Sequence, residues 1–341
     1  MKKICAILSA IALALSLFAG CGGQAPSAPA SSAPPATSAA PEENKPEAAP
    51  AEPEKSEGPH KFGYTCMTMN NPFFITLEKS IRTEVEKNGD ILITTDPAMD
   101  VAKQINQIDD MITQGIELIF LNPVDWEGIR PALEALKAAN VTIVNFDTEV
   151  KDMDYVTAYV GSDNKNAGFV CGEDLVKRFP DGGPIVVLDS PTMNSVNDRI
   201  SGFMEAIDGK GFEIVAQQDA KGDLPTAQGL MDDILQAHPD IIAIMGGNDP
   251  TALGALAACK SANATNILIY GVDGSPDIKA EIAAGSQVAG SGAQSPVQIG
   301  VKSVEVAYQI LKGEPFEART PVETFLINAD NVAEYGTTDW Q

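Results

Sequence analysis

The sequence predicts an α/β fold in which two similar lobes each contain a doubly wound parallel sheet. From residue 61 onward, short apolar runs alternate with amphipathic stretches. Near-continuous apolar strands separated by helices are typical of parallel sheets covered on both faces. The stretch 61–341 is longer than one hydrophobic core usually supports, so two lobes are expected. A repeated spacing of polar residues at strand ends, described below, is the third observation.

Eight apolar runs are the predicted strands, and six amphipathic runs are the main predicted helices. The strands span 61–68, 90–95, 116–121, 141–146, 184–189, 212–217, 240–245 and 266–272. The helices span 72–89, 101–115, 128–140, 166–179, 194–207 and 251–264. The first helix has a clear start signal, because Pro72 has the fixed φ suited to a first helical position and Asn71 can cap the free N–H groups.

Two adjacent phenylalanines, Phe73 and Phe74, follow this helix start. Adjacent helical residues point about 100° apart, so both rings cannot face one core stripe. A sugar ring has C–H faces on which an aromatic ring packs, and the pair is therefore interpreted as a platform for a sugar. In the alternative interpretation, one ring belongs to the core and the other covers the apolar stripe of the helix.

Two βαβ units follow the same plan: a strand that ends in Asn, a helix, and a strand that ends in Asp. The separation is 25 residues from Asn122 to Asp147, and again from Asn248 to Asp273. Ligands of open parallel sheets bind outside the carboxyl ends of the strands, so these residues favour a shared cleft. Carboxylates and carboxamides bind hydroxyl groups well, which suits a neutral polyol. Taken singly, each is more typical of a helix cap or a turn, and chance similarity of the two units is the alternative.

The N-terminal residues carry signals of export and membrane anchoring. Lys2 and Lys3 precede a short apolar run, which is typical of a secretory signal peptide. The run leads through small residues into Cys21. This arrangement resembles the lipobox of bacterial lipoproteins and implies that residues 1–20 are removed and that Cys21 carries the lipid; the alternative is an ordinary signal with an unmodified cysteine. Residues 21–59 are expected to form the anchor and a disordered Ala/Pro/Glu tether, because they lack large apolar side chains.

Charge and cysteine content exclude several kinds of function. The formal net charge is −24, which repels nucleic acid and polyanionic ligands. Three cysteines lie in the predicted folded part, Cys66, Cys171 and Cys259, and we expect them to be buried free thiols. No spacing of Cys and His suggests zinc. We therefore expect no metal, no cofactor and no nucleic-acid partner.

Enzyme motifs are absent from the sequence as well. The two histidines, His60 and His238, have no nucleophile with an orienting acid nearby, and neither G-x-S-x-G nor G-x-x-x-x-G-K-[ST] occurs. Asp147 and Asp273 would form a glycosidase pair only if both met one bond, whereas the repeat places them on opposite lobes. No catalytic residue is expected.

Seven short motifs carry a resemblance to a known family. They are NNPFF, LNPVD, NFDTE, VNDRISGF, GGNDPTALGAL, YGVDGSPD and AQSPVQIG. They occur in the order and near the spacing seen in ribose-binding proteins of bacterial sugar importers, and the resemblance covers residues 61–327. It implies the type I periplasmic binding protein fold, with two lobes joined by a hinge of three crossings. The implied N-terminal lobe is 60–162 plus 295–323, and the implied C-terminal lobe is 163–294 plus 324–341.

The resemblance also implies which residues contact the sugar. They are Asn71, Phe73, Phe74, Asn122 and Asp147 from the first lobe, Arg199, Asn248 and Asp273 from the second lobe, and Gln294 at the hinge. Arg199 has a local alternative, since an arginine in an amphipathic helical run usually lies on the solvated face. Three positions depart from the family pattern: Thr148 replaces an arginine, Gly222 an aromatic ring, and Met67 a polar residue. These departures argue against ribose itself and favour a larger ligand. Trp126 either refills part of that space or is a partly buried ring at a helix start.

Together the observations predict a monomeric solute-binding lipoprotein, anchored outside the cytoplasm through Cys21. It is expected to capture a monosaccharide, a pentose or a hexose, by hinge closure and to deliver it to an ABC permease with its ATPase. The alternative is a sensor that docks on a receptor after binding a sugar or another small solute, such as a nucleoside or a furanosyl signal. A sugar-responsive DNA regulator is disfavoured, because residues 1–59 are interpreted as a signal and a tether rather than a DNA-binding domain.

Overall fold

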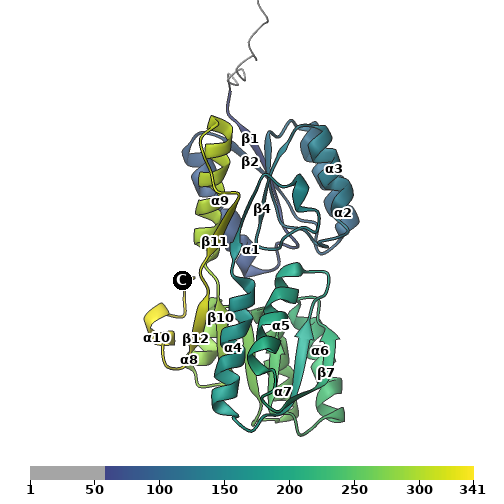
Figure 1. Ribbon diagram of the computed structural model, residues 1–341, viewed down its shortest axis with the longest axis vertical. Coiled ribbons are helices and arrows are strands. Elements are labelled where there is room, and N and C mark those ends of the chain that lie inside the picture. The colour runs from purple at the N-terminus through teal and green to yellow at the C-terminus, as the bar shows by residue number, and fades with distance from the viewer. Residues whose placement is uncertain (1–57) are drawn as a thin grey trace, which may run out of the picture. The chain divides into compact units, whose positions relative to one another are not determined.

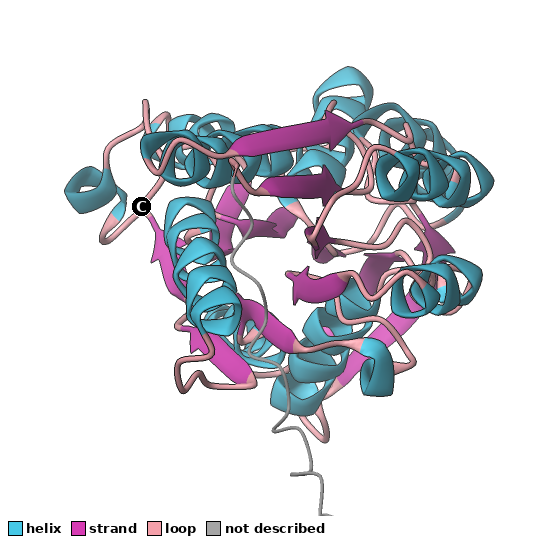
Figure 2. Cartoon of the chain, turned by 90° about the horizontal axis from the view of Figure 1, so that it is seen from above, coloured by secondary structure: helices cyan, strands magenta, loops and turns pink. Residues whose placement is uncertain are grey.

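The computed structural model describes residues 58–341. The predictions made for the signal peptide, Cys21 and most of the tether lie outside this part of the chain. The described residues contain two six-stranded sheets, and each sheet with its helices forms one lobe (Figure 1). Viewed from above, helices lie on both sides of the strands (Figure 2).

The first lobe contains an all-parallel sheet. Its strands are β1 (Lys61–Thr65), β2 (Ile91–Thr95), β3 (Leu118–Leu121), β4 (Thr142–Phe146), β5 (Ala158–Ser162) and β11 (Arg319–Val322). Its helices are α1 (Pro72–Lys87), α2 (Val101–Thr113), α3 (Arg130–Ala138), the 3₁₀ helix η1 (Met153–Tyr155) and α9 (Pro296–Lys312). The strand order is β11-β5-β4-β3-β1-β2, and each neighbouring pair is parallel. The carboxyl ends of the strands therefore share one edge.

The second lobe repeats this arrangement with one antiparallel edge. Its strands are β6 (Gly183–Asp189), β7 (Phe212–Asp219), β8 (Ala243–Gly246), β9 (Leu268–Asp273), β10 (Val288–Ala293) and β12 (Phe325–Asn328). Its helices are α4 (Asn164–Arg178), α5 (Asn194–Ile207), α6 (Leu224–Ala237), α7 (Asp249–Ala262), α8 (Pro276–Ala283) and α10 (Val332–Tyr335). The order is β12-β10-β9-β8-β6-β7, and only β12 runs antiparallel to its neighbour in this sheet.

The predicted fold class is confirmed, and four strands were missed. The eight predicted strands correspond to β1–β4 and β6–β9. The missed strands are β5, β10, β11 and β12. Glycine and small residues interrupt the apolar pattern of β10, which reads VAGSGA, and Pro321 lies within β11. Such strands are held by their neighbours in the sheet rather than by their own composition.

The chain passes between the two sheets three times, after β5, after β10 and between β11 and β12. The first and third connections lie side by side. Asp163 N donates to Val322 O at 3.1 Å, and Thr324 Oγ1 donates to Asp163 O at 3.0 Å. Short connections of this kind let a few residues absorb a change in the angle between two lobes.

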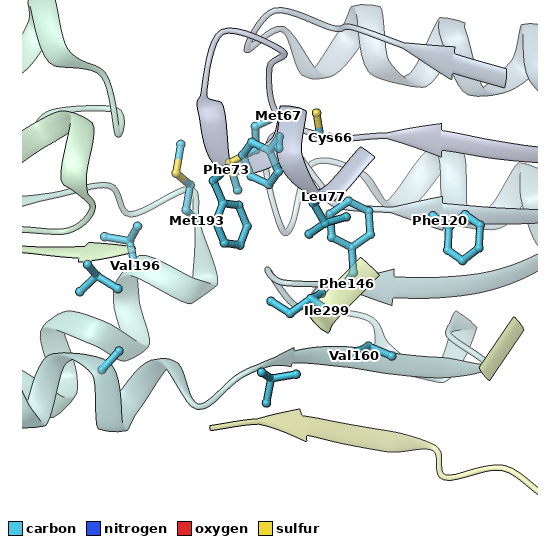
Figure 3. Packing of buried hydrophobic residues seen from close by; sticks show 14 of the residues in the cluster. Cys66, Met67, Phe73, Leu77, Phe120, Phe146, Val160, Met193, Val196 and Ile299 are labelled. Atoms are coloured by element: carbon cyan, nitrogen blue, oxygen red, sulfur yellow. The ribbon is translucent and has the colours of Figure 1, made fainter. Parts of the chain in front are cut away.

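Both faces of each sheet are covered by hydrophobic side chains. One buried cluster lies within the first lobe and another within the second. The largest cluster includes residues of both lobes, among them Phe73 and Phe146 from the first and Met193 and Val196 from the second. Figure 3 shows Met193 and Val196 on the side of the gap opposite Phe73. The lobes therefore meet through apolar contacts as well as through the hinge.

Helices α4 and α5 pack with their backbones in contact. A Cβ atom added at Gly168 would lie 1.7 Å from Arg199 O, and one added at Gly202 would lie 1.9 Å from Lys165 O. Only glycine fits at either position. The close packing fixes the face of α5 that carries Arg199.

We expect Gly202→Ala to lower the free energy of unfolding by about 1–3 kcal/mol, because the added methyl group forces the two helices apart. Gly229→Ala in α6 is the matched control, since nothing lies within 4 Å of its added Cβ. An exposed alanine should stabilise that helix by about 0.5–1 kcal/mol relative to glycine. Urea denaturation measures both, and equal stability of the two variants would contradict the packing described here.

Candidate ligand-binding site

The aspartates that follow the strand ends have constrained backbones. Asp147 follows β4 and Asp273 ends β9, and their φ angles are 57° and 146°. Non-glycine residues in such conformations cost about 1–3 kcal/mol each and persist where the surrounding structure holds them, often at ligand sites. Tyr159 Oη donates to Asp147 O at 2.7 Å, and Gln294 N donates to Asp273 O at 2.9 Å. Both carboxylates border one cavity.

Arg199 of α5 lies between these two carboxylates. Its side chain is buried, with 4% of the residue exposed. Nε donates to Asn164 Oδ1 at 2.8 Å, and Nη1 donates to Gly247 O at 3.0 Å. Nη2 lies 3.7 Å from Asp147 Oδ1, and Nη1 lies 3.7 Å from Asp273 Oδ1. The alternative that placed Arg199 on a solvated face is wrong, because its side chain is buried and hydrogen-bonded to Asn164 and Gly247.

Burial raises the pKa of both carboxyl groups. For Asp147, desolvation outweighs the opposing effect of Arg199. The pKa of Asp273 lies well above its ordinary value, because desolvation is joined by the nearby carboxylate of Asp249. Asp249 is itself buried and accepts hydrogen bonds from Ser291 Oγ at 2.6 Å and from the backbone N–H of Ser275 at 2.7 Å. Additional hydrogen-bond donors would therefore stabilise the ionised form of the carboxylates at this site.

Two carboxamides orient the aspartates and leave acceptor atoms unused. Asn122 Nδ2 donates to Asp147 Oδ2 at 3.0 Å, and Gln294 Nε2 donates to Asp273 Oδ1 at 2.8 Å. Within the described residues, Asn122 Oδ1, Asp147 Oδ1 and Gln294 Oε1 are buried without a hydrogen-bond partner. Such an atom costs about 1–3 kcal/mol. Gln294 and Asp147 border the cavity, whereas Asn122 lies behind Asp147 and positions it.

The other two asparagines at the site are helix caps. Asn71 Oδ1 accepts from Phe73 N at 2.9 Å, and Asn248 Oδ1 accepts from Thr251 N at 3.0 Å. The amide of Asn248 also donates to Gly222 O at 3.0 Å. Both residues still border the cavity. Each of these asparagines can therefore cap its helix and also line the cavity, because helices α1 and α7 begin there.

Both phenylalanines are buried and both border the cavity. Phe73 is 2% exposed and Phe74 is 4% exposed, and their rings meet edge to face with centroids 5.4 Å apart. Neither ring lies on an open surface. Trp340 also packs edge to face on Phe73, with centroids 5.8 Å apart. The sequence analysis did not predict this contact, because no sequence pattern near Trp340 indicates that it lies close to α1 in the fold.

The segment 336–341, which contains Trp340, is fixed to the second lobe. Lys279 of α8 is buried, and its Nζ donates to Asp339 O at 2.5 Å and to Gln341 Oε1 at 3.2 Å. Gln341 Nε2 donates to Asp273 O at 3.0 Å and to Gln294 O. Trp340 therefore connects a segment held by the second lobe to a ring of the first.

The cavity has a volume of about 40 Å³. The cavity is also lined by residues that the sequence analysis does not predict as sugar contacts: Met67, Thr68, Met99, Met193, Ser195, Val196, Lys221 and Gly222. Of these, Met67 and Gly222 had been noted only as departures from the family pattern. The lobes touch around the cavity, where the Thr148 and Ser195 hydroxyls lie 2.7 Å apart and Trp126 N donates to Thr192 O at 3.1 Å. Trp126 is half-buried at the rim and does not border the cavity.

Other expected features can be compared over residues 58–341. Cys66, Cys171 and Cys259 are buried and unpaired, as expected. In this range, no group of three or more His, Cys, Asp and Glu side chains is arranged to hold a metal ion. None of the helices described here combines the length and hydrophobicity needed to cross a bilayer.

Comparison with known proteins defines the class. Residues 62–315 match the family described as periplasmic binding protein domain, and the chain belongs to this family. The ribose import binding protein of Salmonella typhimurium is 32% identical over 261 residues, which cover 76% of this chain and 88% of that protein. The ribose import binding protein of Bacillus subtilis is 34% identical over 267 residues, 77% of this chain and 86% of that protein.

A solved structure shares both fold and sequence. An ABC transporter solute binding protein from Mycobacterium smegmatis, solved with bound glycerol, aligns with a TM-score of 0.78 and 30% identity over 83% of this chain and 99% of that chain. The resemblance inferred from the seven motifs is confirmed by these matches. Proteins of this family bind solutes, which supports a binding role for the cleft rather than catalysis.

The raised pKa of Asp147 gives a testable pH dependence. Its folded-state pKa lies above the unfolded value of about 4, so the folded protein binds more protons between the two values. The contribution of Asp147 to stability is therefore present at low pH and is lost as pH rises through the folded pKa. We expect the free energy of unfolding of the wild type, relative to Asp147→Asn, to fall as the pH rises above about 4. Denaturant titrations across that range measure the difference, and an increase with pH would contradict the assignment.

Proposed function

We propose that the protein is an extracytoplasmic solute-binding protein that captures a small neutral sugar and presents it to an ABC permease with its ATPase. The observation that carries the proposal is the buried Arg199 between Asp147 of one lobe and Asp273 of the other. Hydroxyl groups are the donors that such carboxylates lack, and an uncharged ligand fits a site whose charges already oppose one another. Family membership supports the same reading.

Each of the nine site residues has a proposed role. Phe73 and Phe74 pack on the C–H faces of the sugar. Direct or indirect hydrogen bonding to the hydroxyl groups is proposed for Asn71, Asn122, Asp147, Arg199, Asn248, Asp273 and Gln294. Among these, Asn122 acts through Asp147, because its amide holds that carboxylate. The caps Asn71 and Asn248 offer only the hydrogen-bonding capacity that their helix starts leave unused.

Binding is coupled to closure of the two lobes. Each lobe supplies one aspartate, so a sugar that bonds to both stabilises only the closed arrangement and shifts the population toward it. The proposed bodies are 60–162 plus 295–323 and 163–294 plus 324–341, which is consistent with the sheet to which each strand belongs. The closed form then offers a surface made by both lobes to the permease.

The proposal includes membrane anchoring of a monomer. Residues 1–20 would be removed as a signal peptide, and Cys21 would carry the lipid. The tether at 22–59 would then allow the binding unit to reach the permease. The apolar run and the small residues before Cys21 support this part.

A thermal-shift screen of pentoses, hexoses, polyols and nucleosides tests the function. A ligand that binds only the folded form at 100 times its Kd adds about 2.7 kcal/mol to the free energy of unfolding. We expect at least one monosaccharide to raise the melting temperature. A response to nucleosides alone would overturn the monosaccharide reading.

Asp147→Asn should weaken binding of that sugar by about 1.5–3 kcal/mol, because it removes a charge-assisted hydrogen bond while keeping the side-chain shape. Asp233→Asn, on the exposed face of α6, is the matched control and should bind normally. Isothermal titration calorimetry measures both affinities. Unchanged binding by Asp147→Asn would place the site elsewhere.

Trp340→Ala should weaken sugar binding by about 0.5–1.5 kcal/mol, the usual value of an aromatic pair beyond its buried area. The reason is that the contact between Trp340 and Phe73 joins the two lobes, so it contributes to closure. Trp340→Phe should restore most of the affinity. Stopped-flow measurement of sugar release should show a faster rate in Trp340→Ala. An unaltered rate would mean that the segment 336–341 does not contribute to closure of the lobes.

A further inference from the structure

One side of the cavity is apolar. Met67 and Phe73 of the first lobe and Met193 and Val196 of the second border it and belong to one buried cluster. We call these four side chains the apolar wall. Figure 3 shows Met193 close to Phe73 and Met67 across the gap between the lobes. The wall offers a ligand no strong hydrogen-bonding group, since its most polar atoms are thioether sulfurs.

Met193 closes a space that the backbone leaves open. Gly222 has a φ of 63°, and a Cβ added there would lie 3.0 Å from Asn248 Nδ2 and 3.5 Å from both Sδ and Cε of Met193. The Asn248 amide and the Met193 side chain therefore both lie over the position where Gly222 has no side chain. Methionine is unbranched and fills irregular gaps. Met193 thus extends the apolar wall as far as the Asn248 amide.

Two hydroxyl groups beside the wall already take part in hydrogen bonds within the protein. The hydroxyl of Ser195, which lies between Met193 and Val196 in sequence, is bonded to Thr148 at 2.7 Å. Thr68, which follows Met67, accepts from Asn70 N at 3.2 Å. A ligand hydroxyl directed at the wall would have to compete for these groups.

The unused acceptors lie at the strand ends instead. Asp147 Oδ1 and Gln294 Oε1 are buried without a hydrogen-bond partner in the described chain, and both residues border the cavity. Arg199 lies 3.7 Å from each of the two aspartates, too far for a short hydrogen bond. A ligand hydroxyl therefore finds unused acceptors along the strand ends, whereas the four side chains of the apolar wall offer it no strong hydrogen bond.

We propose that the ligand is a deoxy sugar, in which hydrogen stands where a common monosaccharide has a hydroxyl, so that a ring CH2 or a terminal methyl group faces the apolar wall. This inference rests on the proposed sugar-binding function. A hydroxyl pressed against the apolar wall would lose its bonds to water and gain none. A C–H or methyl group would bury apolar surface at the same place.

Matched pairs of sugars test this directly. The pairs are D-ribose with 2-deoxy-D-ribose and with 5-deoxy-D-ribose, D-galactose with D-fucose, D-glucose with 6-deoxy-D-glucose, and L-mannose with L-rhamnose. Calorimetry gives the ratio of the two Kd values in each pair. In at least one pair, the deoxy member should bind about 5- to 100-fold more tightly, the effect of leaving one buried hydroxyl unpaired.

Met193→Gln links the preference to the wall. Glutamine has a similar length and adds a donor and an acceptor, so the Kd ratio of the preferred pair should fall toward one. Met204→Gln is the matched control, because Met204 lies on the same helix and is exposed, at 36%. It should leave the ratio unchanged. Thermal melting without sugar checks that both variants are folded.

Each outcome bears on the proposal. Equal or tighter binding of the hydroxylated member in every pair would overturn the inference, while the proposed function would stand. A deoxy preference unaltered in folded Met193→Gln would overturn the assignment to this wall. Failure of every sugar in the pairs and in the thermal screen would overturn the proposed function itself.

Discussion

The constraint on which the rest of this structure depends is a buried guanidinium shared by two lobes. An ion removed from water is tolerated only when it is paired and hydrogen-bonded. Arg199 meets this condition through Asn164 and Gly247 on its own lobe, and Asp147 of the other lobe lies 3.7 Å from it. The same demand explains the glycine contacts of α4 and α5, because the helix that carries the charge must not shift.

Cavity size then determines how a ligand enters. A cavity of about 150 Å³ binds benzene in an engineered protein, and a monosaccharide is larger than benzene. The cavity that Asp147 and Asp273 both border is about 40 Å³. A sugar therefore requires the lobes to part slightly or the side chains of Met67, Met99 and Met193 to move. Methionine makes such movement inexpensive, because its unbranched chain repacks readily. The polar end of the site is rigid by comparison, since hydrogen bonds hold Asp147 and Asp273 at both backbone and side chain.

Local sequence patterns predicted the features that depend on local order. Apolar runs predicted the eight strands they encode, and the matched spacing of Asn122 to Asp147 and Asn248 to Asp273 predicted residues that the structure places around one centre. Local sequence patterns did not predict features that depend on contacts between distant parts of the chain. Strand β10 has little apolar character of its own, and nothing near Trp340 indicates that it reaches Phe73. The burial of Arg199 likewise depends on residues distant in the sequence, Asn164, Gly247 and Asp147, so the pattern of its own helix left two interpretations open.

Met193 contributes to the cavity although it is an unfavourable residue for the start of its helix. It occupies the N-cap position of α5, and no side chain caps that helix. Ser, Thr, Asp and Asn are preferred there, and a residue without a capping oxygen costs about 0.5–2 kcal/mol. The side chain instead covers Gly222 and joins the apolar wall. A residue that is unfavourable for its helix but contributes to the cavity is typical of a binding site. Because α1 presents Phe73 from its own first turn, two helix starts supply the apolar side of the cavity while two strand ends supply its polar side.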